Sequence, residues 1–507
     1  MASNLHLSIV LYNIPLLMVL TFLGLTLVAG LYCTQKATTF REYAVGNKRF
    51  HTTTLVVTVL ATVFEGGLLM REAPNVYAIG LRYILYLFAK VIHVWIISLL
   101  GLRMGPFMEH FSAAETIGSV YGKYPRAITA VLGICFSIGV VAIQINVMSW
   151  AMGMCIDSID PRILTMLATL ILIAYAVLGG VRAITITDVL QFATFMIITA
   201  LLIKFLFIKT SKSFLEVLLL IEKQEKLQLS SLFQVEGKLF KLVKVYVFAA
   251  FFLAPTIIQR VYMAASPIQA YKVFLRVTLF TAIISGCVAL IGLLVFVGDP
   301  TLLKTAVWPY ILVDMPPVYK GYIIISLLGL TMSTADSSLH TAAIMVSNDI
   351  VESIRGVQVG SCIDQIRLAK CTTLVTGLLA MIVTIYYPNL SNLTEFVVKY
   401  AIGFFTITVA PPFILAIFGF RGSTRTALIG MAIGTLVCLI WNKWGTLTTE
   451  IDSGIIAIAA NGLAMMAAHY LLPQPIGKGW IGKDSQEKRI RQLIRAFKAY
   501  KKSIDLE

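Results

Sequence analysis

The densest group of polar residues inside an apolar stretch of this sequence is SLLGLTMSTADSSLHTAAIMVSNDI, residues 326–350. On a helix, Ser333, Thr334 and Ser337 share one face, with Leu330 one turn before them. Two hydroxyls and a backbone carbonyl are hard oxygen ligands that suit a weakly polarising cation such as Na+, and the nearby carboxylate of Asp336 would raise the affinity or form a second site. The alternative is that these hydroxyls donate to carbonyls of their own helix.

Two other apolar stretches are interrupted by residues that break helices. Glu65 is followed by Gly66 and Gly67, which weaken a helix where a buried acid needs a partner or a cavity. Pro255 removes a backbone hydrogen bond from the stretch 244–264. A broken helix exposes carbonyl groups that can bind a cation. For the first stretch, the alternative is a loose helix in which Glu65 forms a structural pair with a lysine.

Asp188 lies in GGVRAITITDVLQ, just over one turn into an apolar stretch. An acid in a membrane-spanning helix is a candidate functional group. The alternative is an acid near a helix start, where the helix dipole stabilises it. Three further ionisable residues lie in apolar stretches: Lys90, His93 and Lys399.

The elements that position these residues belong to a membrane protein. Of the 507 residues, 58% are hydrophobic and 13% are charged, and the mean hydropathy is +0.86. A soluble domain has about 25% charged residues, so soluble enzymes and fibrous, disordered or disulfide-scaffold proteins are excluded. The apolar residues form about 13 stretches of roughly 20 residues, which suits membrane-spanning helices and not the alternating strands of a β-barrel. We predict an all-α integral membrane protein.

The distribution of charge predicts the orientation. The formal net charge is +16, and its Lys and Arg residues concentrate in alternate loops, which indicates cytoplasmic loops and not nucleic-acid binding. We therefore expect a multi-pass protein of the plasma membrane, with the N-terminus outside and the C-terminus in the cytoplasm. The short loops favour a bacterial inner membrane.

Three stretches resemble signatures of the sodium:solute symporter family, which includes sodium/proline, sodium/pantothenate and sodium/sugar symporters. GGVRAITITDVLQ is similar to the family's Gly-Gly…Ala…Thr-Asp…Gln signature, and APTIIQRVYMAASPIQAYK to its Pro…Ile-Ile-x-Arg-x-x-Ala-Ala stretch. MSTADSSLHTAAIMVSNDI is similar to its Met-Ser-Thr-x-Asp-Ser-x-Leu…Asp-Ile motif. The three occur in the family's order, and the resemblance spans about residues 10–470.

The resemblance implies a LeuT-type core of ten helices in two inverted repeats, with one helix before it and two after. The spacing of the two interrupted stretches, five elements apart, agrees with such a repeat. The expected division is an N-terminal additional helix at 1–35, a transport core at 36–420 with repeats at 52–208 and 244–419, two C-terminal helices at 421–475, and a basic cytoplasmic tail at 476–507.

The resemblance also implies the binding sites. The sodium ligands would be the carbonyls of Ala61, Phe64 and Leu330 and the hydroxyls of Ser333 and Thr334. A second cation site, present in some relatives, would involve Asp188, Ser333, Asp336 and Ser337. The candidate solute-binding residues are Glu65, Gly66, Gly67, Phe251 and Pro255.

Several positions differ from the sodium/proline branch. Val63 replaces an acid, Glu65 replaces a small polar residue, and Val247 and Phe251 replace an aromatic pair with loss of a hydroxyl. These differences disfavour proline as the solute. A buried acid at position 65 indicates an amine-bearing or cationic solute, or a proton.

We expect a sodium-coupled secondary active symporter that imports a small organic solute, such as an amino acid, an amine or a vitamin-like compound, by alternating access. The alternatives are a proton-coupled symporter of the same fold and a transporter-like sensor with a signalling tail. No acid–His–Ser or metal-ligand cluster indicates an enzyme. The expected partners are Na+ as the coupling ion, the solute and the lipid bilayer, with no nucleic acid and no other cofactor.

Overall fold

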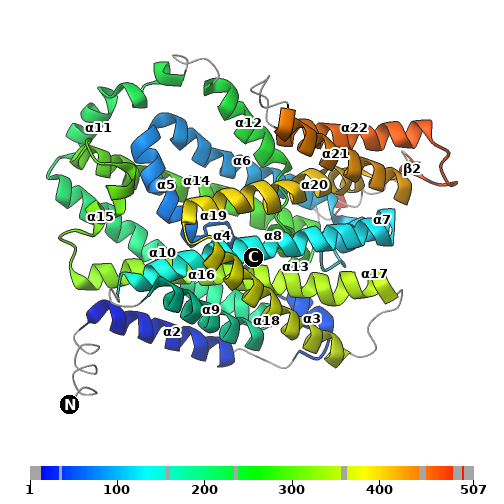
Figure 1. The fold of residues 1–507 in the computed structure, drawn as a ribbon, viewed down its shortest axis with the longest axis horizontal. Coiled ribbons are helices and arrows are strands. Elements are labelled where there is room, and N and C mark those ends of the chain that lie inside the picture. The colour runs from blue at the N-terminus through cyan, green and yellow to red at the C-terminus, as the bar shows by residue number, and fades with distance from the viewer. Residues whose placement is uncertain are drawn as a thin grey trace.

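Long apolar helices make up most of the protein (Figure 1). The computed structural model describes residues 13–32, 37–155, 160–232, 238–355, 362–444 and 453–482, together with residues 491, 494 and 495. Within these residues, nine helices are long and apolar enough to cross a membrane, or ten if one bent pair is a single span. Three shorter apolar helices, Ile14–Gly30, Thr52–Val63 and Pro161–Ala174, occupy the remaining predicted stretches. The count of about 13 spans therefore stays a prediction.

The helices follow the predicted stretches in order. The first half contains α2 (Ile14–Tyr32), α3 (Phe40–Val45), α4 (Thr52–Val63), α5 (Gly66–Ile79), α6 (Leu81–Arg103), α7 (Ala113–Tyr121), α8 (Lys123–Gly153), α9 (Pro161–Leu178) and α10 (Val181–Thr210). The second half contains α11 (Phe214–Glu222), α12 (Lys238–Phe251), α13 (Pro255–Met263), α14 (Pro267–Gly298), α15 (Val307–Leu312), α16 (Pro317–Ile344), α17 (Val351–Arg355), α18 (Cys362–Tyr386), α19 (Leu390–Phe396), α20 (Gly403–Phe418), α21 (Thr424–Trp444) and α22 (Ser453–Leu471). Met345–Ile350 and Val397–Ile402 form π-helical turns.

Local sequence explains where several helices begin and end. α14 starts at Pro267 because the Ser266 side chain accepts a hydrogen bond from the Gln269 N–H and Pro267 occupies the first helical position. Gly80, with a φ of 74°, forms the turn between α5 and α6, a backbone conformation that favours glycine.

Both predicted interruptions are confirmed. Between α4 and α5 the backbone leaves the helix at Phe64 (φ −100°, ψ 85°) and Glu65 (φ −77°, ψ 152°). α12 ends at Phe251, α13 begins at Pro255, and the two helices are bent by 46° at the break. Because helix ends leave backbone groups without helical partners, each break offers free carbonyls or N–H groups inside the protein.

The polar run of α16 lies in the centre of the fold. α16 is almost entirely buried, and it packs against α8, α10, α2 and α18 (Figure 1). α4 and α5 also contact it. The run predicted to bind a cation is therefore surrounded by protein on every side.

Two connecting segments, after α11 and after α20, make contacts with other parts of the fold. Beyond α11, Lys226 donates from Nζ to the Tyr77 carbonyl (2.7 Å) and lies 3.7 Å from the ring centroid of Phe296. A two-residue strand β1 (Phe420–Arg421) pairs antiparallel with β2 (Gly479–Trp480). Most of the predicted basic tail lies outside the described residues.

Candidate functional site

The break after α4 lies directly against α16. A Cβ placed on Gly66 would collide with Cγ2 of Thr331 and lie 2.9 Å from the carbonyl oxygen of Leu327, one turn before Leu330. The ring of Phe64, at the break itself, is buried and lies 6.1 Å from the ring of Phe195 on α10. The structure therefore brings together the two stretches that the sequence predicted to form one site.

The hydroxyls of α16 divide into two groups. Thr331, Ser338 and Thr341 donate to carbonyls of their own helix, as the alternative interpretation predicted. Ser333 instead donates to Oδ1 of Asp188 at 2.6 Å. The Thr334 Oγ1 is buried, and no partner is found for it among the described residues.

Asp188 joins four helices through one buried carboxylate. Its Oδ2 accepts a short hydrogen bond from Thr58 of α4 and lies 3.2 Å from Nη2 of Arg260 on α13. Its Oδ1 accepts the hydrogen bond from Ser333 of α16. Asp188 is completely buried and lies seven residues after the start of α10, beyond the first turn in which the helix dipole would stabilise an acid.

Arg260 occupies the predicted second cation site. The same Nη2 that lies beside Asp188 donates to the Ser337 hydroxyl at 2.5 Å, and this hydroxyl lies 3.5 Å from Oδ1 of Asp336. Asp336 is also fully buried. Arg260 was not among the candidate residues predicted from the sequence, although a cation inside the apolar stretch 244–264 was a visible signal.

Glu65 has different partners from the predicted lysine. Its Oε2 accepts a hydrogen bond from Nε2 of Gln144 at 2.7 Å, and its Oε1 lies 4.0 Å from Nη2 of Arg71. Lys90 lies over the ring of Phe64, with Nζ 5.4 Å from the ring centroid. Arg71 and Gln144 were not singled out from the sequence because their proximity to Glu65 arises only in the folded chain.

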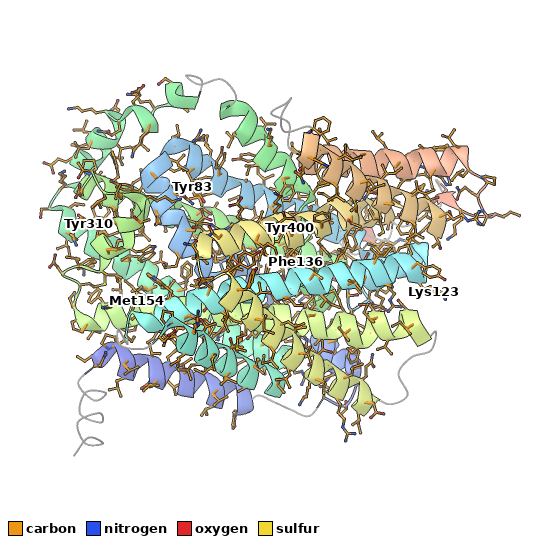
Figure 2. The ribbon with its side chains drawn as sticks, in the orientation of Figure 1. Tyr83, Lys123, Phe136, Met154, Tyr310 and Tyr400 are labelled. Atoms are coloured by element: carbon orange, nitrogen blue, oxygen red, sulfur yellow. The ribbon has the colours of Figure 1, made fainter. Side chains whose placement is uncertain are left out.

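At the second break, Phe251 and Phe252 both pack against the main hydrophobic core. Phe251 packs against a cluster that includes Ile407 and Ile458. Phe252 instead lies 5.3 Å from the ring of His93 and 6.1 Å from that of Phe136 (centroid distances; Phe136 is labelled in Figure 2). Pro255 is buried as the first residue of α13.

Comparisons with known proteins identify the family of the chain. Residues 43–434 match the sodium:solute symporter family. The chain belongs to the sodium:solute symporter family. It is therefore a multi-pass membrane protein of a family of sodium-coupled solute transporters.

Solved structures show the same fold. A Na+-coupled sialic acid symporter, in a substrate-bound outward-open state with a novel Na+ site, superposes with a TM-score of 0.80 at 20% identity, covering 92% of this chain and 99% of that one. MhsT in complex with L-phenylalanine gives a TM-score of 0.52 at 11% identity, covering 82% of this chain and 97% of that one. No curated protein sequence matches. The symporter thus has the predicted LeuT-type fold.

The close approach at Gly66 gives a testable expectation for this symporter. In Gly66→Ala, the new Cβ would collide with Cγ2 of Thr331 and lie 2.9 Å from the Leu327 carbonyl, which the helix holds in place, so we expect at least a tenfold loss of sodium-stimulated uptake. In Gly67→Ala, the nearest atom is a methyl of Val147 at 3.3 Å, which can shift, so uptake should stay within about twofold of wild type. Uptake assays in proteoliposomes with matched protein amounts measure both. An equal loss in the two variants would contradict the expectation.

A second buried polar group, the α7 cluster, consists of Ser112, Glu115, Arg126, Asn348 and Asp349. Asp349 accepts hydrogen bonds from Ser112 Oγ (2.6 Å) and Arg126 Nε (2.9 Å). Glu115 accepts from the Phe111 N–H (2.8 Å) and from Asn348 Nδ2 (3.2 Å). Burial raises the pKa of Glu115 to about 7, and the charge of Asp349 adds to the rise.

The raised pKa of Glu115 predicts a pH-dependent stability. A carboxyl whose pKa is higher in the folded protein than its ordinary 4.5 favours folding when protonated. Its contribution is complete below the ordinary pKa and is lost as the pH rises through about 7. Relative to Glu115→Gln, which cannot titrate, the wild-type Tm should therefore fall by a few degrees between about pH 5 and pH 8. Parallel pH profiles of the two proteins would rule out this role of Glu115.

Proposed function

We propose that this chain imports a small organic solute, such as an amino acid, an amine or a vitamin-like compound, together with Na+ by alternating access. The observation that carries the proposal is the pair Ser333 and Thr334. Their hydroxyls are not used by their own helix, whereas Thr331 and Ser338 on the same helix are. They lie beside a break in α4–α5 that frees backbone carbonyls.

The donor set fits a sodium ion. The proposed ligands are the carbonyls of Ala61, Phe64 and Leu330 with the hydroxyls of Ser333 and Thr334. All five are uncharged oxygens, which suits a hard monovalent cation, and the carbonyl end of α4 carries the negative end of a helix dipole. A buried hydroxyl such as that of Thr334 loses about 1–3 kcal/mol if it stays unpaired, so a ligand there relieves an existing penalty.

Two buried acids and a hydroxyl support a second cation site near Asp188. Asp188 and Asp336 supply carboxylate oxygens, and the Ser337 hydroxyl between Arg260 and Asp336 supplies a third hard oxygen. Asp188, Asp336 and Ser337 are therefore the proposed second site. The guanidinium of Arg260, 3.2 Å from Oδ2 of Asp188, already neutralises part of the charge of this carboxylate.

The coupling follows from the position of the sodium ligands. An ion that binds both α4 and α16 stabilises the conformation in which the solute site is formed, so each ligand increases the affinity for the other. Each Na+ that enters releases about 2.3 kcal/mol per 100 mV of membrane potential. This energy alone sustains a solute gradient of more than tenfold.

The predicted topology completes the proposal. The transport core at 36–420 would contain the inverted repeats 52–208 and 244–419, flanked by one helix before it and two after. The N-terminus would lie outside and the C-terminus in the cytoplasm of a bacterial inner membrane. The alternation of Lys and Arg between loops supports this orientation.

The test is uptake of solute into proteoliposomes under separate ion gradients. The solute is chosen by a thermal-shift screen of amino acids, polyamines, vitamins, organic acids and sugars, each with Na+ or with K+. We expect accumulation under an inward Na+ gradient and none under a pH gradient in K+ buffer. Accumulation driven by the pH gradient alone would refute sodium coupling and favour a proton-coupled symporter that uses Glu65, Asp188 or Asp336.

A further inference from the structure

Lys90 is a buried basic residue whose Nζ has no hydrogen-bond partner among the residues that the structure describes. Its Nζ is shielded from solvent, and no hydrogen-bond acceptor or carboxylate is found within bonding distance among the described residues. An ammonium group has three donors and no acceptor. The ring of Phe64, 5.4 Å away, offers a cation–π contact worth about 0.5–2 kcal/mol. This is less than the several kcal/mol lost when a charge is buried unpaired.

Lys90 lies on the one face of α6 that contacts both helix breaks. Its Nζ contacts Phe64 at the α4–α5 break. His93, one turn later on α6, lies 3.0 Å through Nδ1 from the Ala249 carbonyl and 5.3 Å through its ring from Phe252, at the α12–α13 break. In a transporter with discontinuous helices, the solute binds between the breaks. The Lys90 ammonium is therefore located where a solute would be held.

The acids near Lys90 already have partners. Glu65 binds Gln144 and lies 4.0 Å from Arg71, and Glu72 lies 3.7 Å from the same guanidinium. Both acids interact electrostatically with Lys90 without forming an ion pair with it. Tyr83 of α6, labelled in Figure 2, interacts with Glu72 and Arg71, and its hydroxyl accepts a hydrogen bond from Nδ2 of Asn75 at 2.9 Å.

We propose that Lys90 binds the carboxylate of a zwitterionic solute of the amino-acid type, whose ammonium group pairs with Glu65. The proposal rests on the proposed transport function of the same site. Glu65, Glu72, Arg71 and Lys90 carry two negative and two positive charges, so only a ligand with no net charge leaves the site neutral. The Glu65 side chain is 24% exposed and is thus accessible to such a ligand. The carboxylate supplies the acceptor that the Lys90 ammonium lacks.

The test compares matched solutes that differ only in the carboxylate. The purified full chain is titrated with L-leucine, L-leucinamide and isoamylamine, with L-phenylalanine, L-phenylalaninamide and phenethylamine, and with L-proline, L-prolinamide and pyrrolidine. Each titration is made in Na+ and in K+ and followed by thermal shift. We expect at least one amino acid to bind, and its amide and amine to bind at least tenfold more weakly.

Variants then assign this preference to Lys90. In Lys90→Met, the amino acid should lose at least tenfold in affinity, and the ratio between amino acid and amide should fall close to one. Lys90→Arg should restore most of the ratio. The control Lys204→Met removes an exposed lysine from α10 and should behave as wild type. Lys90→Gln serves if the methionine variant is not monodisperse.

Three outcomes would overturn the proposal: tightest binding by an amide or amine, an unchanged ratio in Lys90→Met, or no binding by any amino acid in the series. The proposed sodium-coupled transport and the proposed role of Lys90 can be refuted independently. Lys90-dependent binding of a zwitterion that is identical in Na+ and K+ would refute the sodium-coupled function and keep this inference. Sodium-dependent binding of an amine would do the reverse.

Discussion

Alanine at both Ser333 and Thr334 is expected to abolish the stimulation of solute uptake by Na+. The double variant removes the only two side-chain ligands of the proposed site and leaves three backbone carbonyls, too few to replace the hydration shell of the ion. Uptake under a Na+ gradient should fall to the level measured in K+, a loss of at least tenfold. Proteoliposome uptake at increasing Na+ concentration measures the effect, and the solute affinity in Na+ should fall in parallel because the two ligands are linked.

The neighbouring residue Thr331 provides a matched control. Its hydroxyl donates to the carbonyls of Leu327 and Leu328 in its own helix, so Thr331→Ala removes a polar group of the same kind from the same element. Its sodium dependence should stay within about twofold of wild type. If the double variant also keeps its sodium dependence, the ion binds elsewhere and the assignment of the site is wrong.

The fold was predictable because the signals lie in local sequence. Apolar stretches of about 20 residues predicted membrane-spanning helices, and α22, Ser453–Leu471, is an observed helix of this length. Gly66 with Gly67, and Pro255, marked the two breaks because their backbone chemistry weakens a helix wherever they occur. The family resemblance supplied the LeuT-type arrangement, which composition alone does not determine.

The partners within the site were not predictable in the same way. Arg260 contacts Asp188 from 72 positions away, and Gln144 contacts Glu65 from 79 positions away. Such pairs form only when the helices pack, and a single sequence carries no record of them. The ring contacts of Phe252 with His93 and Phe136 likewise join segments far apart in the sequence. The ligand set proposed for Na+ stays a prediction.

The buried pair of Arg260 and Asp188 gives the largest expected effect on stability. Arg260→Met should lower the free energy of unfolding by about 3–5 kcal/mol, because it leaves the buried carboxylate of Asp188 without its cation. Arg260 and Asp188 have side-chain exposures of 1% and 0%, so water cannot replace the lost partner. The double variant Arg260→Met/Asp188→Asn removes the uncompensated charge as well and should be more stable than Arg260→Met alone. Thermal unfolding in detergent compares the wild type, Arg260→Met, Asp188→Asn and the double variant.

A surface ion pair distinguishes burial from charge as the cause. Arg41 lies 2.7 Å from Glu109, whose side chain is 74% exposed, so Arg41→Met should change the stability by less than about 1 kcal/mol.

Additive losses in the Arg260 and Asp188 variants would mean that the two residues are not energetically coupled. We expect the two residues to be energetically coupled. We also expect Na+ to raise the Tm of Arg260→Met more than it raises the Tm of the wild type. A cation can then neutralise the carboxylates that the guanidinium no longer reaches, and the predicted second site would be accessible to Na+ once Arg260 is removed.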